Sequence, residues 1–546
     1  MKLISFPFLS LVVGLILTVS SCKNLADLNV NPNGVNPATA HPNLVLSTVL
    51  TETGRAFVNL GYQDIAGVMQ HTQKDGWSGA HNDYEWGGSQ SWSEYYDILR
   101  NNQYVYDRAV ALDFELHQGI ALVMKSMLFG LITDLWGDAP YSQALKGELG
   151  GAENTFPVFD TQEAIYTGIL ADLEKANTLL SKPKSAYNST AEAADVYYKG
   201  DPGKWRKLAN SLALRYYMRI SSKKPDVAKA GIEKIVANAA QYPIITASAD
   251  DAAMPFAGNS NADSWPANTT YDATESNYRR LKMADTFVKA LLAINDPRLT
   301  VWANKVQIPL VVDATLPAKT DKIVDGKRYL SPDQVAGKEV NTDPNYVGLP
   351  TAIVGGSTYN LSQTGEQAAK NPHVSWLNDI YRAAKGPLLK ARLLAASEVN
   401  FILAEAAQKG WAAGDAKARY EAGIKNSLET WGVDGAYAAY IAQKGVAFNG
   451  TQQQIIEQKW IASWTAATEA WFDYRRTGFP QLAAGPNAKR KVLPVRFYYM
   501  LDERNLNKAN ADAALNRLEQ TPFSEADGKN SAWSKPWVLQ GTAKPW

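Results

Sequence analysis

Residues 120–135 read IALVMKSMLFGLITDL. Apolar side chains recur three or four positions apart along this stretch, at Met124, Met127, Leu128, Leu131 and Leu135. That spacing places them on one face of an α-helix. The stretch therefore predicts a long helix whose apolar face is buried in a core.

The same helical spacing recurs elsewhere in the chain. It is found at residues 93–110, 160–180, 201–216, 393–407 and 454–471. Asp160-Thr161-Gln162-Glu163 resembles a capping box, and Asp201-Pro202 combines an N-cap residue with proline at the first helical position. We therefore expect an α-helical protein with few strands.

The helical pattern weakens between about residues 239 and 390. Ile308–Val312 and the Asp325-Gly326 turn indicate one or two short strands, and residues 341–356 form a long loop rich in Pro and Gly. Long structured loops on a helical scaffold are common places for binding surfaces. We expect this part to be less regular than the rest of the domain.

The N-terminus has the pattern of a secretory signal. Lys2 precedes the apolar run from Ile4 to Val19, which ends at Ser20-Ser21 and the only cysteine of the chain, Cys22. A cysteine after two small residues looks like the lipobox of bacterial lipoproteins, where the thiol receives a diacylglyceryl anchor. The alternative is an ordinary signal peptide with an unmodified cysteine.

These features divide the chain into three parts. We expect a lipoprotein signal peptide at residues 1–21, a lipidated tether at 22–42 and one large domain at 43–546. Lys plus Arg is 55 and Asp plus Glu is 54, so the net charge is +1 and gives no reason to expect a nucleic-acid partner.

No motif for catalysis, a metal or a cofactor stands out. The five histidines are scattered, and neither a phosphate-binding loop nor a Gly-x-Ser-x-Gly motif occurs. Asp83 and Glu85 could act as the acid and base of a glycoside hydrolase, but close acids in a polar loop are more often solvated surface.

Two loops have the composition of a sugar-binding surface. Trp and Tyr can stack on the C–H face of a sugar ring, while Asn and Asp bind its hydroxyls. The first loop contains Trp77, Asn82, Asp83, Tyr84 and Trp86, and the second contains Asp263, Trp265, Asn268 and Tyr271. The alternative is that these aromatic rings hold their loops against the helices below.

Several motifs in order resemble one family. They are Asn29–Asn33 after the tether, Thr133–Tyr141, Asp160–Tyr166, Asp201 with Leu208–Leu212, Asn295–Leu299, Ser397–Ala406 and Glu469–Pro480. Behind a lipobox, this series resembles the SusD/RagB-like nutrient-binding outer-membrane lipoproteins of Bacteroidetes, in their SusD-like-2 branch.

The resemblance implies a single α-rich domain of tetratricopeptide-like helix pairs with long ligand-binding loops. It also implies a lipid-anchored protein at the cell surface that is not an enzyme. Such a protein binds an oligosaccharide, or in some members a peptide, and delivers it to a SusC-like TonB-dependent transporter. A scaffold protein and a lipid-anchored hydrolase remain alternatives.

The resemblance also bears on individual residues. Trp136, Trp205 and Trp471 lie on predicted helices or at their ends, so we interpret them as part of the scaffold. Asp473 and Arg475-Arg476 are interpreted as an ion cluster that is buried or faces a partner.

Overall fold

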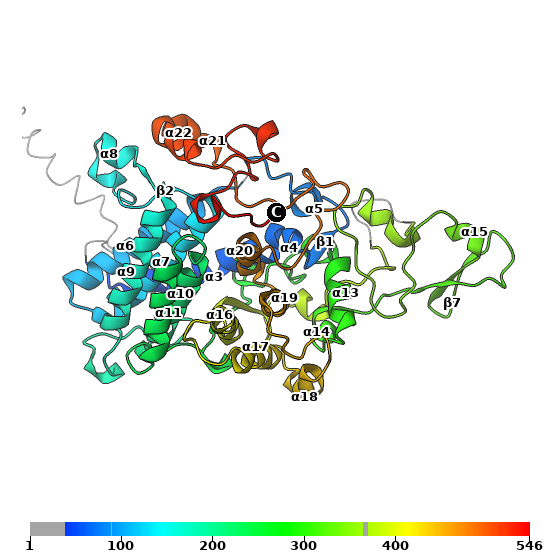
Figure 1. Cartoon of the computed structure of the whole chain (residues 1–546), viewed down its shortest axis with the longest axis horizontal. Helices are drawn as coiled ribbons and strands as arrows, with labels where there is room; N and C mark the ends of the chain where they lie inside the picture. Colours follow the sequence, from blue (N-terminus) through cyan, green and yellow to red (C-terminus); the bar gives the residue numbers. More distant parts are fainter. Residues whose placement is uncertain (1–38, 89, 364–369) are drawn as a thin grey trace, which may run out of the picture.

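The computed structural model describes residues 39–88, 90–363 and 370–546 (Figure 1). The predicted signal peptide, Cys22 and the tether up to residue 38 lie outside the described residues. Statements about the fold and its sites refer to the described part of the chain.

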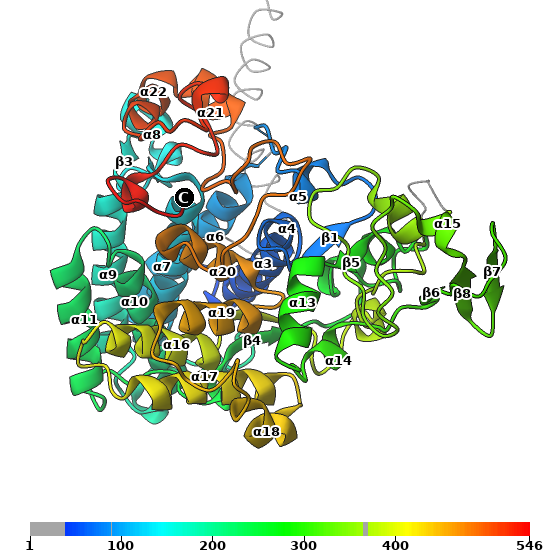
Figure 2. The same ribbon diagram turned by 45° about the vertical axis from the view of Figure 1, so that its right-hand side comes forward.

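Long helices occupy one side of the molecule, and short helices, strands and loops occupy the other (Figures 1 and 2). The long N-terminal helices are α3 (Asn43–Tyr62), α6 (Ser93–Ala111), α7 (Glu115–Trp136), α9 (Gln162–Leu179), α10 (Pro202–Arg219) and α11 (Pro225–Ala237). The C-terminal ones are α16 (Ala396–Gln408), α17 (Ala416–Thr430), α19 (Gln452–Ala462) and α20 (Ala467–Thr477). The protein is mostly helical, as predicted.

Consecutive long helices pack against one another as pairs, such as α6 with α7 and α16 with α17. The central helix is α7, which also contacts α9 and α10. Gly130 allows the approach of α10, because a Cβ there would lie 2.2 Å from the Tyr216 hydroxyl. By length and apolarity α7 could cross a membrane, but 94% of its apolar window is buried inside this fold. It is a core helix, as its sequence predicts.

The less regular part holds most of the short elements. Its strands are β4 (Ala252–Pro255), β5 (Leu281–Met283), β6 (Leu310–Val312), β7 (Asp321–Val324), β8 (Lys327–Leu330) and β9 (Lys390–Leu394). Its helices are α12 (Ser276–Arg279), α13 (Asp285–Ala293), α14 (Leu299–Trp302) and α15 (Pro332–Val335). β7 and β8 form a hairpin through Asp325-Gly326, and β8 pairs in parallel with β6. The strands predicted at Ile308–Val312 and beside the Asp325-Gly326 turn are therefore confirmed.

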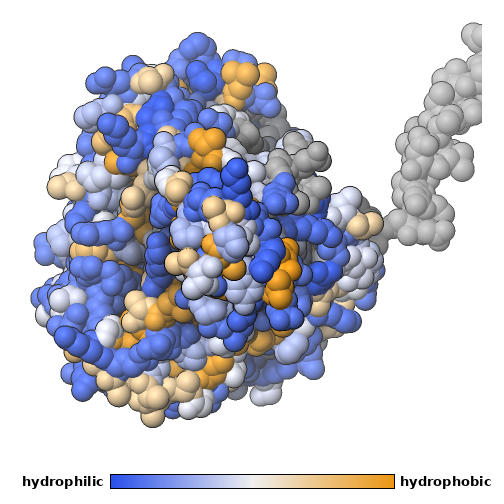
Figure 3. Space-filling view, turned by 90° about the vertical axis from the view of Figure 1, so that its right-hand side faces the viewer, coloured by the Kyte–Doolittle hydropathy of each residue, from blue (hydrophilic) through white to orange (hydrophobic). Residues whose placement is uncertain are grey.

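The remaining elements are short and lie at the edges of the helical part. They are α4 (Asp64–Val68), β1 (Thr72–Lys74), α5 (Gly79–Asn82), β2 (Ala139–Pro140), α8 (Ala152–Thr155), β3 (Phe159–Asp160), α18 (Tyr437–Ile441), α21 (Leu501–Leu506) and α22 (Lys508–Asn516). The loop-rich end of the molecule is mainly hydrophilic, with separate small hydrophobic spots (Figure 3). No broad apolar patch therefore covers the face shown there.

Three helix predictions were wrong in detail. The predicted helix at 454–471 is two helices, because the chain turns at Thr465, whose φ is +68°. The predicted helix at 393–407 begins at Ala396, since residues 390–394 pair with β4 as a strand. Thr161, rather than Asp160, caps α9: its hydroxyl accepts the Ala164 N–H, and Asp160 instead accepts the N–H groups of Tyr141 and Ser142.

Ten charged side chains form an ion network inside the helical part. Five are basic and five acidic, and only Glu398 among them is more than marginally exposed. They are Asp134 of α7, Arg215 and Arg219 of α10, Glu398 and Glu405 of α16, Lys459 of α19, and Glu469, Asp473, Arg475 and Arg476 of α20. The predicted ion cluster at 473–476 is thus buried within the protein.

Short contacts join these side chains into two neighbouring groups, one of Asp134, Arg215, Arg219, Glu398, Glu469 and Arg475 and one of Glu405, Lys459, Asp473 and Arg476. Arg219 contacts Asp134 at 3.4 Å and Glu469 at 2.5 Å, and Arg476 contacts Glu405 at 2.5 Å. Burial alone would raise the pKa of Asp473, but nearby Lys459 and Arg476 hold it below its usual value. Each charge has a partner of opposite sign, which offsets part of the cost of burying it, although burial still raises the pKa of Asp134.

Arg219→Ala tests this ion network. The substitution leaves the carboxylates of Asp134 and Glu469 buried without one of their cations, so we expect a loss of about 3 to 5 kcal/mol in the free energy of unfolding. Chemical denaturation followed by circular dichroism measures it. Lys229→Ala, at an exposed position of α11, is the control and should change little. Equal midpoints for the two variants would contradict a stabilising role for the network.

Candidate ligand-binding site

A short antiparallel pairing builds the candidate site. β1 pairs with β5, so that Lys74 lies opposite Leu281. Just beyond the strands, the Asp75 N–H donates to the Arg280 carbonyl at 3.1 Å. The fully buried side chains of Asp75 and Lys282 form an ion pair at 3.0 Å beneath this edge. The chain leaving β1 is therefore fixed beside the chain entering β5.

Trp77 stands on the surface at this edge. Its φ of +55° is in the left-handed region, where a residue with a side chain is uncommon, and its ring is 65% exposed. The Arg280 guanidinium lies over the ring, 5.5 Å from its centroid, in a cation–π contact. The arrangement presents a large ring and a fixed cation to solvent.

A small hollow opens beside Trp77. Its lining includes Lys74, Arg280, Gln63, Ser276 and Asn277, and no Asp or Glu among the described residues. Burial lowers the pKa of Lys74, and the carboxylate of nearby Asp64 partly offsets this. The Arg280 Nε is buried without a hydrogen-bond partner in the described part of the chain. The hollow thus offers several side-chain donors around the Trp77 ring.

An aromatic face with hydrogen-bond donors around it suits a sugar. The C–H face of a sugar ring can lie on an indole, and the surrounding amide, hydroxyl and guanidinium groups can bind its hydroxyls. Gln63, Trp77 and Asn277 are exposed in the structure, so a ligand can reach them without rearrangement of the core.

The other members of the first predicted loop are buried. Trp86 is 2% exposed, donates from Nε1 to the Ala80 carbonyl and makes edge contacts with Trp471 and Phe497. Tyr84 is fully buried. These rings hold the loop on the core and present no face to a sugar, so the prediction that they stack on a ligand does not agree with their positions.

The polar residues of this loop also have internal roles. The Asn82 side chain accepts the Lys74 N–H at 2.9 Å and donates to the Lys74 carbonyl at 2.8 Å, which fixes the end of β1. Asp83 is 7% exposed, whereas Glu85 is exposed. Burial, and to a smaller degree the charge of Glu85, raises the pKa of Asp83 from 3.8 to about 6.

The second predicted loop meets the first. Trp265 is buried, with its ring edge-on to Tyr62 at 5.0 Å, and Pro266 beside it lines the same hollow as Trp77. Asn268 is buried and donates to the Trp265 carbonyl. Asp263 and Tyr271 are exposed, and the Tyr271 hydroxyl donates to the Gly258 carbonyl. The structure thus brings Trp77 of the first loop and Pro266 of the second to one hollow, whereas the exposed ring of Tyr271 does not line it.

Sequence reasoning missed Lys74, Arg280 and Asn277. Their part in the hollow depends on the pairing of β1 with β5, two short strands that lie far apart in the sequence. Neither strand has an alternating pattern long enough to be recognised. In the sequence, Trp77 was the only lining residue that indicated a binding site here.

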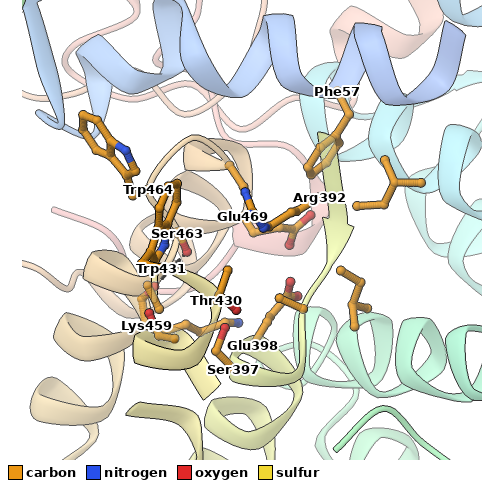
Figure 4. Close-up of a pocket in the computed structure, with 16 residues that line it drawn as sticks. Phe57, Arg392, Ser397, Glu398, Thr430, Trp431, Lys459, Ser463, Trp464 and Glu469 are labelled. Atoms are coloured by element: carbon orange, nitrogen blue, oxygen red, sulfur yellow. Dashed lines mark hydrogen bonds between the residues drawn. The ribbon is translucent and has the colours of Figure 1, made fainter. Parts of the chain in front are cut away.

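A second cavity lies inside the helical part (Figure 4). Glu398, Lys459 and Glu469 line it together with Arg392 and Trp431. The first three are already paired, with Arg215, Asp473 and Arg219 respectively. The cavity therefore belongs to the ion network of the scaffold. Among the described residues, no group of three or more His, Cys, Asp or Glu side chains could hold a metal ion.

Comparison with known proteins identifies the family. A family model described as "Starch-binding associating with outer membrane", SusD-like_2, matches residues 36–310 and 327–500. The chain belongs to the SusD-like family. No individually curated protein sequence matches it significantly.

Solved structures show the same SusD-like fold. A chitin-binding SusD homologue from Flavobacterium johnsoniae is 21% identical with a TM-score of 0.69, and 92% of this chain and 99% of that chain are covered. A SusD homologue from Bacteroides fragilis is 22% identical with a TM-score of 0.69 and the same coverage. Trp136, Trp205 and Trp471, interpreted from the sequence as scaffold, are all fully buried.

The raised pKa of Asp83 predicts how stability depends on pH. The folded protein keeps a proton on Asp83 up to about pH 6, whereas the unfolded chain loses it near 3.8. The contribution of Asp83 therefore becomes less favourable as pH rises between these values. Asp83→Asn does not ionise, so its stability relative to the wild type should be higher at pH 7 than at pH 4.

Urea denaturation at the two pH values measures this difference. Asp107→Asn, at an exposed position of α6, is the matched control and should show no comparable change with pH. A difference between Asp83→Asn and the wild type that is the same at both pH values would show that Asp83 ionises normally.

Proposed function

We propose that this protein binds a glycan at the Trp77 hollow and delivers it to a SusC-like TonB-dependent transporter in the outer membrane. It would be held at the cell surface by lipid on Cys22. Membership of a family described as starch-binding and associated with the outer membrane supports the glycan and the location. The lipobox pattern supports the anchor.

The observation that carries the ligand assignment is the exposed indole of Trp77 beneath the Arg280 guanidinium. Trp77 is 65% exposed and its backbone is left-handed, and an indole held at the surface beside hydrogen-bond donors is a candidate platform for a sugar ring. The Flavobacterium relative is described as chitin-binding, which makes chitin fragments reasonable probes beside starch fragments.

The main alternative is a peptide ligand. An extended peptide is recognised mainly through backbone hydrogen bonds along a strand edge or groove. The hollow here has a ring platform and side-chain donors, which favours a sugar. A panel of maltooligosaccharides, chitooligosaccharides and peptide digests, tested by calorimetry, separates the two.

Trp77→Ala tests the site. Loss of a stacking ring is expected to weaken binding of the tightest oligosaccharide about tenfold, since such a contact contributes roughly 1 to 1.5 kcal/mol. Because the ring is exposed, the melting temperature should stay close to that of the wild type. Calorimetry measures the affinity, and Arg280→Gln should weaken it in the same direction.

Phe156→Ala is the matched control, because Phe156 is also an exposed aromatic residue, 46% exposed, and lies beside α8. It should bind as the wild type does. Unchanged affinity in Trp77→Ala and Arg280→Gln would place the ligand elsewhere on the protein.

A further inference from the structure

A further hollow lies where the C-terminal residues meet the end of α20. Its lining includes Tyr474 of α20, Phe479 just after that helix, Lys491, and Lys544 and Trp546 near the C-terminus. No Asp or Glu side chain lines it in the described part of the chain. None of these residues belongs to the Trp77 hollow.

The two lysines of this hollow are unpaired. Among the described residues, no carboxylate oxygen lies within 4.0 Å of either ammonium group. Lys491 is exposed, and Lys544 is partly buried with its ammonium 5.4 Å from the centroid of the Phe479 ring. The side chains that line the hollow thus carry two cations and no carboxylate, which favours an anion there.

The aromatic wall of the hollow is fixed in place. Trp546 donates from Nε1 to the Leu493 carbonyl at 3.1 Å, and its ring packs edge-on against Phe523 at 4.9 Å. A ring held in this way needs no ordering when a ligand binds, which lowers the entropic cost of binding. The free surface of Trp546, together with Phe479 and Tyr474, gives a ligand apolar contacts beside the two ammonium groups.

Gly478 explains how the C-terminal segment comes so close to α20. Its φ of +80° ends the helix in the left-handed conformation that favours glycine. A Cβ at this position would lie 3.1 Å from the Pro545 carbonyl and 3.4 Å from the Lys544 Nζ. Glycine thus leaves room for the segment that carries Lys544 to the rim of the hollow.

A neighbouring hollow extends the space available. It shares Gln481 and Leu482 with the hollow that Lys491 and Lys544 line. Its lining includes Gln453, Glu457 and Ile461 on one face of α19. Amide groups can donate to and accept from hydroxyls, whereas the carboxylate of Glu457 disfavours a second anion. The hollow with the two lysines therefore favours an anion, and the neighbouring hollow on α19 favours neutral hydroxyl groups.

From this geometry we propose that the lysine hollow is a second saccharide site, which binds a carboxylate-bearing sugar residue of an acidic oligosaccharide. Lys491 and Lys544 bind the carboxylate, Trp546 and Phe479 cover apolar faces of the sugar, and the chain continues past Gln481 towards α19. The site does not depend on the Trp77 hollow or on the function proposed for it.

Calorimetry on the purified full chain tests this proposal with pentagalacturonate and its methyl ester, which keeps the sugar rings but lacks the charges. The wild type should bind the acid at least tenfold more tightly than the ester, with an affinity that falls as salt is added. Lys491→Gln and Lys544→Gln should each weaken binding of the acid about tenfold, the size expected for loss of a charged hydrogen bond.

Two controls make the result specific. Lys229→Gln removes an exposed lysine from α11 and should bind the acid as the wild type does. Phe156→Ala, at an exposed aromatic residue that lines neither hollow, should also leave this affinity unchanged. The Trp77 hollow is tested with neutral oligosaccharides, so failure of one site and failure of the other can be told apart. Equal affinity for acid and ester, or no effect of either lysine substitution, would overturn the proposal. Equally tight, lysine-dependent binding of a penta-glutamate peptide would overturn the assignment to sugars.

Discussion

The buried ion network between α7, α10, α16, α19 and α20 constrains the whole helical part. Taking ten charges out of water is favourable only if each meets a partner at close range. Arg219 can reach Asp134 and Glu469 together only when α7, α10 and α20 hold one relative position. Apolar packing tolerates small shifts between helices, but this pairing does not. The network therefore selects one packing of the scaffold among several that would bury similar apolar area.

The surface sites depend on that scaffold through a few intermediate contacts. Trp86 packs on Trp471, which lies on α20 beside the ion network, so the loop that begins at Trp77 is attached to the same helix. The lysine hollow forms at the other end of α20, where Gly478 admits the C-terminal segment. Both candidate sites are thus formed by irregular segments held on a rigid helix, an arrangement that limits the entropy lost on binding.

The sequence was sufficient for the helices whose pattern is local. The apolar spacing of residues 120–135 and the Asp201-Pro202 start are confirmed as α7 and α10, and the Asp325-Gly326 turn joins β7 to β8. The break at Thr465 was not predicted, since nothing in the residues around it is a strong helix breaker. The ordered series of motifs also identified the family, because each motif is recognised by its residues and does not depend on contacts made in the fold.

The candidate site could be predicted only in part. Composition identified two loops, and the structure brings both to one hollow. Composition could not distinguish Trp77, which is exposed, from Trp86 and Trp265, which are buried. That difference depends on partners distant in the sequence, Trp471 and Phe497 for Trp86 and Tyr62 for Trp265.

A crystal structure with the tightest-binding oligosaccharide tests the central claim most directly. Our account predicts a sugar ring lying on the Trp77 indole beside Arg280. Sugar density only at other surfaces, with Trp77 bare, would contradict it.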